Sequence, residues 1–160
     1  MANRKTFPAL VGTGISLAIA DVKACSMASL HIHPRSAEIF VVLSGRVYTE
    51  MIPEGGVLDA DGKPRVIRTE LRANQTTIFP MGSFHAQMNP DCTPALIVAA
   101  FASDDPGAAL VVPQAFEQTD EFVLDSFGGA ISVEELARFR QAIPQGAFFE
   151  VEECRKRCGL

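Results

Sequence analysis

Residues 31–45 read HIHPRSAEIFVVLSG and contain two of the three histidines in the chain. His31 and His33 are two residues apart, so on a β-strand both side chains project from the same face. The segment 34–37 begins with proline and favours a turn, which resets the alternation of the chain. Glu38 can therefore re-enter beside the histidines, although its odd spacing would place it on the opposite face of an unbroken strand. The apolar residues 39–43 then predict a buried strand that Gly45 ends.

The third histidine lies in a second predicted hairpin, residues 74–89. Pro80, Met81 and Gly82 turn the chain there, and His85 follows on the returning strand. Three neutral imidazoles and one carboxylate form a mixed nitrogen and oxygen site that suits Mn, Fe, Co, Ni or Zn. An octahedral ion would keep two positions open, whereas tetrahedral zinc would be fully coordinated. We favour the octahedral case, with one divalent ion held by His31, His33, Glu38 and His85.

The rest of the chain predicts an all-β barrel or jelly roll with a short helical C-terminal extension. Short runs rich in Val, Ile, Phe and Thr alternate with turn residues, and residues 53–64 form an exposed loop. Helical signals come late: a capping box at Ser132 and Glu135 starts one helix, and another is expected at 120–127 with Gly128 as its stop. The expected strands are 15–21, 26–33, 38–44, 46–52, 66–71, 76–80, 84–89 and 94–102.

A single domain is expected over residues 1–160, with a barrel at about 7–112 and the extension at about 113–160. The net charge of −5 argues against nucleic acid, which binds clustered Lys and Arg. The apolar run 7–20 follows Arg4 and Lys5 and imitates a signal peptide. Pro8 and two glycines interrupt it, so it is too short for a membrane span and predicts a strand from about residue 15.

Four cysteines, Cys25, Cys92, Cys154 and Cys158, allow three complete pairings, and the sequence does not choose among them. Cys154 and Cys158 would share one face of a helix. A four-cysteine zinc site is an alternative, but the spacing lacks the paired C-x2-C motifs that are typical of such sites.

Two motifs resemble those of the cupins. Residues 31–45 are similar to H-x-H-x(3,4)-E-x(6)-G, and residues 80–89, PMGSFHAQMN, are similar to P-x-G-x2-H-x3-N. Segments 7–12, 105–107 and 153–160 add a resemblance to germin-like and fungal or slime-mould spherulin-like proteins. The resemblance implies a jelly-roll barrel, a metal that is often manganese, a homo-oligomer such as paired trimers, and secretion; a cytoplasmic location is the alternative.

The chain departs from the germin pattern in its pocket. Asn74 replaces a glycine, although asparagine tolerates the left-handed conformation. Oxalate-oxidising germins carry asparagines where this chain has Ala18 and Ala28, and alanine offers no hydrogen bond to a small dianion. Oxalate oxidation is therefore in doubt. The other candidate substrate contacts are apolar or amide side chains near the ligands: Met27, Met81, Phe84, Gln87 and Asn89.

Three functions follow as hypotheses. The first is a metal-dependent enzyme acting on a small organic metabolite by oxidation, isomerisation or lyase chemistry, with Glu38 as a ligand and candidate general base. The second is a manganese germin-type oxidoreductase, either superoxide dismutase or oxalate oxidase. The third is a non-catalytic, spherulin-like stress or storage protein in which the metal only stabilises the fold. No membrane or nucleic-acid partner is expected.

Overall fold

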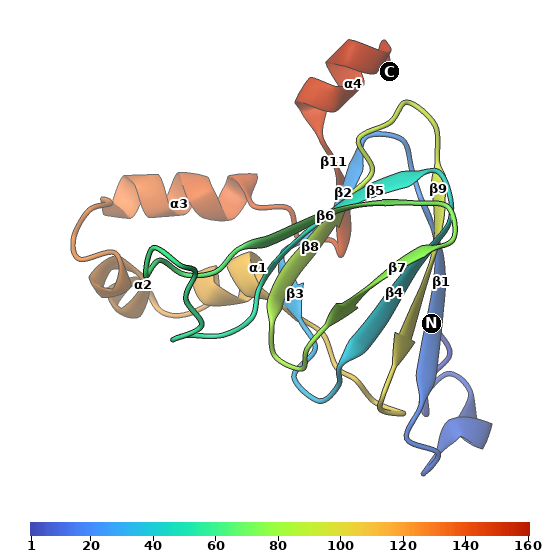
Figure 1. Cartoon of the computed structure of the whole chain (residues 1–160). Coiled ribbons are helices and arrows are strands. Elements are labelled where there is room, and N and C mark those ends of the chain that lie inside the picture. The colour runs from blue at the N-terminus through green and yellow to red at the C-terminus, as the bar shows by residue number, and fades with distance from the viewer.

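The alternating strands pair into two antiparallel sheets in the computed structural model, which describes residues 1–160 (Figure 1). The first sheet has four strands in the order β1-β9-β4-β7. Their bounds are Ser16–Val22 for β1, Ala95–Phe101 for β9, Glu38–Ser44 for β4 and Gln75–Phe79 for β7.

The second sheet has seven strands and is assembled from both ends of the chain. Five follow the order β10-β3-β8-β2-β11, and β5 pairs with β8 and β6. The bounds are Ala109–Leu110 (β10), His31–Ile32 (β3), Phe84–Met88 (β8), Ser26–Ala28 (β2), Phe148–Glu150 (β11), Arg46–Ile52 (β5) and Ile67–Arg72 (β6).

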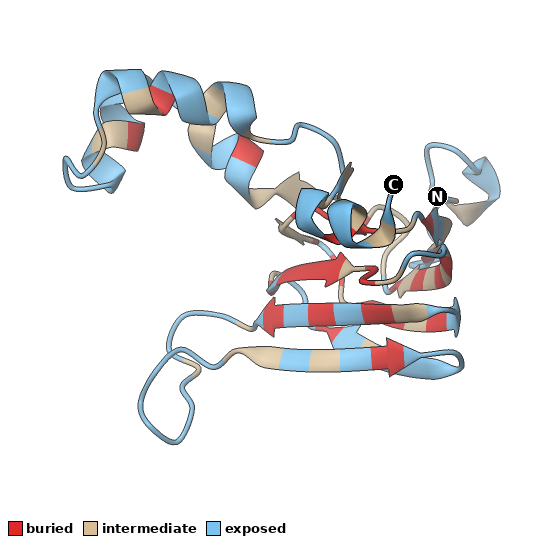
Figure 2. Ribbon diagram, turned by 90° about the horizontal axis from the view of Figure 1, so that it is seen from above, coloured by how far each residue is buried: buried red, intermediate tan, exposed pale blue.

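The inward faces of the two sheets enclose one hydrophobic core. Burial alternates along the strands (Figure 2), and every second residue of β5 and of β9 is buried. The alternation confirms the period-two pattern expected from the sequence. The core cluster contains Val22, Phe40, Val42, Val47, Met51, Leu71, Phe79, Ala95, Ile97, Ala99 and Phe101.

Most of the expected strands are confirmed within one or two residues, but the strand expected at 26–33 is divided into β2 and β3. The division occurs because residues at the break bond elsewhere. The Ser29 amide donates to Ala147 and its hydroxyl to Gly146, while the Leu30 carbonyl accepts from Val111. These partners come from the C-terminal third of the chain, which local sequence patterns do not reveal.

Four helices follow or flank the barrel, and α1 to α3 extend away from it on one side (Figure 1). The capping box predicted at Ser132 is confirmed, and α2 ends before Gly128, which has a φ of 61°. The sequence did not predict α1, β10, β11 or the short 3-10 helix Pro8–Leu10. The helix bounds are Val111–Phe116 (α1), Asp120–Ser126 (α2), Val133–Ala142 (α3) and Glu152–Cys158 (α4).

Two disulfides attach α4 to the barrel. Cys25 pairs with Cys154 and Cys92 pairs with Cys158. This arrangement selects one of the three pairings and leaves no free cysteine for a four-cysteine zinc site. None of the helices has the length and apolar character needed to cross a bilayer. The division into barrel and extension near residue 112 remains a prediction.

Asn89 is a fully buried structural residue that holds three backbone segments together. Its side-chain amide donates to the carbonyls of Val22, Lys23 and Thr93, at 3.0, 3.1 and 2.8 Å. Its carbonyl oxygen accepts from the Asp91 amide at 2.9 Å. All the polar atoms of this side chain are thus occupied within the fold, which leaves none for the substrate contact expected from the sequence.

We predict that Asn89→Ala lowers the free energy of unfolding by about 2–4 kcal/mol, because buried carbonyls lose their hydrogen-bond donors. Denaturant unfolding with the disulfides intact measures the change. Gln141→Ala, which removes an exposed amide side chain of α3, serves as the control and should cost less than about 1 kcal/mol. Equal costs for the two variants would contradict this role of Asn89.

Candidate metal centre

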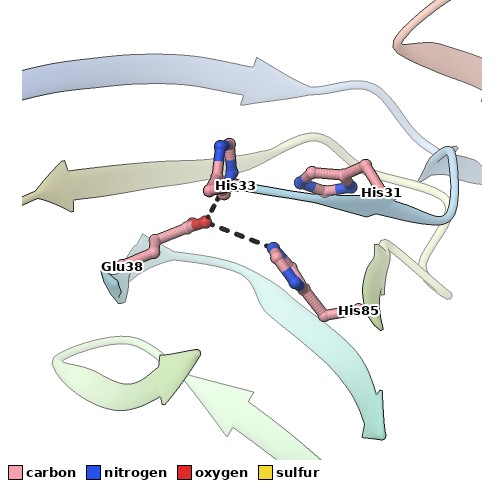
Figure 3. A group of neighbouring side chains, drawn as sticks. All are labelled: His31, His33, Glu38 and His85. Atoms are coloured by element: carbon pink, nitrogen blue, oxygen red, sulfur yellow. Dashed lines mark ion pairs between the residues drawn. The ribbon is translucent and has the colours of Figure 1, made fainter. Parts of the chain in front are cut away.

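The four predicted ligands converge inside the barrel from both sheets (Figure 3). His31 lies in β3 directly opposite His85 in β8, and His33 follows at the end of β3. Glu38 is the first residue of β4. The turn at 34–37 does reset the alternation, since His33 and Glu38 are both buried, at 5% and 3% exposure.

Backbone carbonyls orient all three imidazoles in the same way. The Nδ1 atoms of His31, His33 and His85 lie 2.7, 2.6 and 2.8 Å from the carbonyl oxygens of Ser29, Gly107 and Ser83. A carbonyl can only accept, so each Nδ1 carries the proton and donates it. The lone pair of each neutral ring is therefore on Nε2, the tautomer that a metal ligand of this kind requires.

The Nε2 atoms and the Glu38 carboxylate lie close together without forming hydrogen bonds. Glu38 Oε2 lies 3.0 Å from His33 Nε2 and 3.4 Å from His85 Nε2. Both Glu38 Oε2 and His85 Nε2 are buried, and neither atom has a hydrogen-bond partner. One ligand atom from each of the four residues lies within 4.8 Å of the others. Buried polar atoms without partners are costly, and a shared cation would satisfy them together.

The electrostatics of the cluster favour a carboxylate surrounded by basic nitrogens. Burial raises the pKa of Glu38, but the contacts with His33 and then His85 outweigh it and lower that pKa from 4.5 to about 2. Burial and the nearby His85 lower the pKa of His31 from 6.5 to about 4. Burial alone would lower the pKa of His33, but its contacts with Glu38 and the Gly107 carbonyl raise it above 6.5.

A salt-bridged loop fixes the carbonyl that orients His33. The Arg35 guanidinium donates to the carbonyl of Asp105 at 3.0 Å and to its carboxylate at 3.0 Å, and its backbone amide donates to Pro106. Gly107 has a φ of 67°, and a Cβ there would lie 2.8 Å from Arg35. Glycine thus allows the loop to lie against Arg35 with its carbonyl directed at His33.

Two polar side chains share the interior with the histidines. Gln87 follows His85 by two residues on β8, and Thr49 lies opposite Gln87 on β5. Both are 5% exposed, and neither side chain makes a hydrogen bond within the chain. Gln87 was expected from the sequence, whereas Thr49 was missed. Its signal was its place in the alternating strand β5, which becomes informative only once the register with β8 is known.

Ala18 and Ala28 lie on inward-facing parts of the barrel, as expected from the sequence. Ala18 lies on the inward face of β1 and packs against the core, and Ala28 is 5% exposed in β2. Neither adds a polar group to the interior. Both positions stay predicted substrate contacts.

Three other expected contacts do not face the ligands. Phe84 is adjacent to His85, so strand alternation points it outward. Phe84 and Met27 line a cavity of about 1220 Å³ whose walls also include Thr49 and Gln87 but none of the four ligands. Met81 is 62% exposed at the turn between β7 and β8. The odd offset of Phe84 from His85 directs it away from the ligands, and its contact with substrate, like those of Met27 and Met81, stays a prediction.

The family model described as Cupin matches residues 1–132. The chain belongs to the cupin family. The two-sheet barrel described above is thus the cupin jelly roll that the two histidine motifs predicted, and the four converging side chains occupy the positions of those motifs.

Among curated proteins, this cupin is similar to spherulins and germin-like proteins. It is 30% identical to Spherulin-1A of Physarum polycephalum over 158 residues, covering 99% of this chain and 61% of the relative. It is 32% identical to germin-like protein subfamily 2 member 3 of Arabidopsis thaliana over 133 residues, covering 81% of this chain and 57% of the relative. The chain thus spans about three fifths of the length of the curated relatives it matches.

Solved structures support the same fold. Oxalate oxidase in complex with the substrate analogue glycolate superposes with a TM-score of 0.78 at 23% identity, covering 91% of this cupin and 71% of that chain. Pumpkin seed globulin superposes equally well, with a TM-score of 0.78 at 18% identity, covering 93% and 37%. An enzyme and a seed globulin share this fold, so the likeness establishes the architecture alone.

We predict that the metal-free cupin loses stability as the pH falls from about 6.5 to about 4, in part through His31. The folded His31 has a lowered pKa, so the unfolded chain binds the extra proton in this range, and acid favours unfolding. His31→Gln should flatten the dependence by up to about 1.4 kcal/mol per pH unit, as measured by denaturant unfolding with a chelator present.

His33→Gln is the matched control with the opposite sign. Because the folded pKa of His33 is raised, its stabilisation is present below 6.5 and is lost as the pH rises through the folded value. This variant should therefore change the dependence above pH 6.5. An unaltered slope between pH 4 and 6.5 in His31→Gln would refute the assignment.

Proposed function

We propose that this cupin is a metal-dependent enzyme that acts on a small organic metabolite by oxidation, isomerisation or lyase chemistry. The observation that carries the proposal is the convergence of three Nε2 lone pairs on a carboxylate whose buried oxygen lacks a hydrogen-bond partner. His31, His33, Glu38 and His85 would hold one divalent ion. When bound, such an ion would polarise an oxygen atom of the substrate.

The residues around the centre suggest how a substrate is held. Gln87 and Thr49 offer an amide and a hydroxyl on the face of β8 and β5 that carries His85. Their hydrogen-bonding groups are not used by the protein, so they are available to orient a polar substrate. The core aromatics that pack on the histidines, Phe79 and Phe101, exclude water from the other side.

Glu38 suits the role of ligand better than that of general base. A base is most effective when its pKa is near the working pH, and the pKa of Glu38 is lowered to about 2. The ionised carboxylate also balances part of the charge of the cation. Glu38 is therefore assigned as a metal ligand. It would act as a general base only in a step in which its carboxylate leaves the metal.

Manganese is the proposed ion, with Fe, Co, Ni and Zn as alternatives. Nitrogen and carboxylate ligands suit all five, and the resemblance to germins favours manganese. Four protein ligands on a six-coordinate ion would leave room for a substrate oxygen. The two disulfides agree with the extracellular location that the resemblance implies.

Two alternative functions are distinguished by specific features. A germin-type oxalate oxidase or superoxide dismutase shares the ligand set, but Ala18 and Ala28 provide no donors for oxalate, which argues against that substrate. A spherulin-like stress or storage protein would use the metal only for stability. The unused polar groups of Thr49 and Gln87 favour the enzyme over this third hypothesis.

We predict that the purified protein holds about one divalent ion per chain and that His85→Ala holds almost none, as measured by elemental analysis. Gln87→Leu should keep the ion and the melting temperature of the loaded protein. It should lower kcat/KM at least tenfold on any small organic acid or carbonyl substrate that the wild type turns over, because an orienting hydrogen bond is lost.

Gln114→Leu, at an exposed position of α1, is the matched control and should leave kcat/KM unchanged. A wild type that binds no metal would overturn the centre itself. A loaded wild type that turns over no member of such a substrate panel, yet melts lower after chelation, would support the storage or stress role instead.

We also propose that the protein forms a homo-oligomer through the outer face of the sheet β1-β9-β4-β7. Five exposed apolar side chains lie on it: Leu17, Ile19, Ile39, Leu43 and Ile78 are 39, 62, 52, 43 and 57% exposed. The half-buried Val41, Leu96, Val98 and Ala100 join them into rows across the strands. No helix covers this face (Figure 1).

A second copy of the chain fits this face best. Charged side chains are absent from the rows that contain Ile19 and Ile39, so the partner surface that covers these rows must be uncharged. Four strands of seven residues or fewer give a projected area of roughly 400 Å². The protruding side chains make the accessible area of this face larger than its projected area. The accessible area thus approaches the value of about 800 Å² that each partner buries in a stable interface. Two such faces would pack as in a β-sandwich.

We predict that Ile19→Glu at least halves the molar mass measured by light scattering, because the symmetric interface would then bury one unpaired carboxylate from each copy. Val133→Glu, at a 60% exposed position of α3, is the control and should keep the wild-type mass. A wild type that is monomeric at micromolar concentration, or an Ile19→Glu variant of unchanged mass, would refute this interface while leaving the metal centre untouched.

A further inference from the structure

The four cysteines form one sulfur cluster with a buried and an accessible half. Cys25 and Cys154 are 0 and 2% exposed, so their disulfide is closed to solvent. Cys92 is exposed and Cys158 is half-buried, so the second disulfide is open to a small reagent. The two halves touch, because Cys158 Sγ lies 3.5 Å from Cys25 Sγ.

A fixed cation lies beside the buried disulfide. The Arg157 guanidinium lies 3.2 Å from Cys154 Sγ and is held there by a 2.6 Å hydrogen bond to the Pro90 carbonyl. Arg157 has no carboxylate partner among the salt bridges of the chain, unlike Arg155, which pairs with Glu150. Its charge is therefore available to stabilise negative charge on Cys154.

We propose that the Cys92–Cys158 disulfide is an exchange site for small thiols, and that Cys158 then passes the exchange to the buried pair. The product is a Cys25–Cys158 disulfide with a small thiol attached to Cys92. The substrate class is a low-molecular-weight thiol of the glutathione kind. This inference concerns the tail of the chain and is independent of the metal centre.

The sequence of bonds is balanced and needs no oxidant. The external thiolate attacks the exposed Cys92 Sγ, the Cys92–Cys158 bond breaks, and Cys158 leaves as a thiolate. Freed from Cys92, the Cys158 side chain can rotate to approach Cys25 Sγ along the axis of the buried disulfide. The Cys25–Cys158 bond forms, the Cys25–Cys154 bond breaks, and Cys154 leaves as a thiolate beside Arg157. Two disulfides and one thiolate are present before and after.

The backbone keeps the tail in place during the exchange. The Val151 amide donates to the Cys25 carbonyl at 2.7 Å, and β11 pairs with β2. Residues of α4 therefore remain beside Cys25 when the outer disulfide opens. Both the original and the exchanged disulfide connect Cys25 to α4, so the helix stays tethered while the segment around Cys92 gains a charged, hydrophilic adduct.

The test treats the native protein with reduced glutathione, quenches with acid, blocks free thiols with N-ethylmaleimide and maps the peptides by mass spectrometry. We expect glutathione on Cys92, a Cys25–Cys158 crosslink and N-ethylmaleimide on Cys154. An intact Cys25–Cys154 crosslink with N-ethylmaleimide on Cys158 would overturn the relay, and the absence of any adduct would overturn the exchange site.

Variants separate the steps. Arg157→Ala should slow formation of the Cys25–Cys158 crosslink about threefold, since the leaving thiolate loses its cation, while adduct formation on Cys92 keeps its rate. Lys156→Ala, which removes a neighbouring surface cation, is the matched control and should change neither rate. In Cys158→Ser the Cys25–Cys154 crosslink should survive the treatment, and its loss there would show that Cys158 is not the relay.

Discussion

The hydrogen bonds from three imidazole Nδ1 atoms to backbone carbonyls are the constraint on which the site depends. Each bond fixes a tautomer as well as a ring orientation, so the three lone pairs meet at one point before any cation arrives. The carbonyls of Ser29 and Ser83 come from the strands or turns next to the histidines themselves. The carbonyl of Gly107 comes from a loop that is distant in sequence, residues 105–107. Arg35 holds this loop in place.

The sequence was sufficient for the parts of the structure that depend on local alternation. The spacing of His31 and His33, the turn that brings Glu38 back into phase, and the capping box of α3 all follow from nearest neighbours in the chain. Asn74 adopts the left-handed conformation expected of it, with a φ of 65°. These features need only the geometry of a strand, a turn or a helix end.

The parts that could not be predicted depend on pairing between distant segments. The break between β2 and β3 exists because residues 146–148 bond there, and Thr49 joins the site only through its register with Gln87. Phe84 shows the complementary limit, because it adjoins His85 along the chain but strand alternation directs its side chain to the opposite face. Asn89 lies within a recognised motif, yet its side chain is used entirely by the backbone around it.

The pairing of β11 with β2 also sets an order on folding during synthesis. Residues 148–150 complete an edge of the second sheet that starts with residues 26–28. The ribosome releases β11 only after β3 to β10 and the helices α1 to α3, so β2 keeps an unpaired edge until residues 148–150 emerge. Oxidation of Cys25 with Cys154 must wait equally long, across a separation of 129 residues. The nascent barrel is thus open along one edge until residues 148–150 emerge from the ribosome.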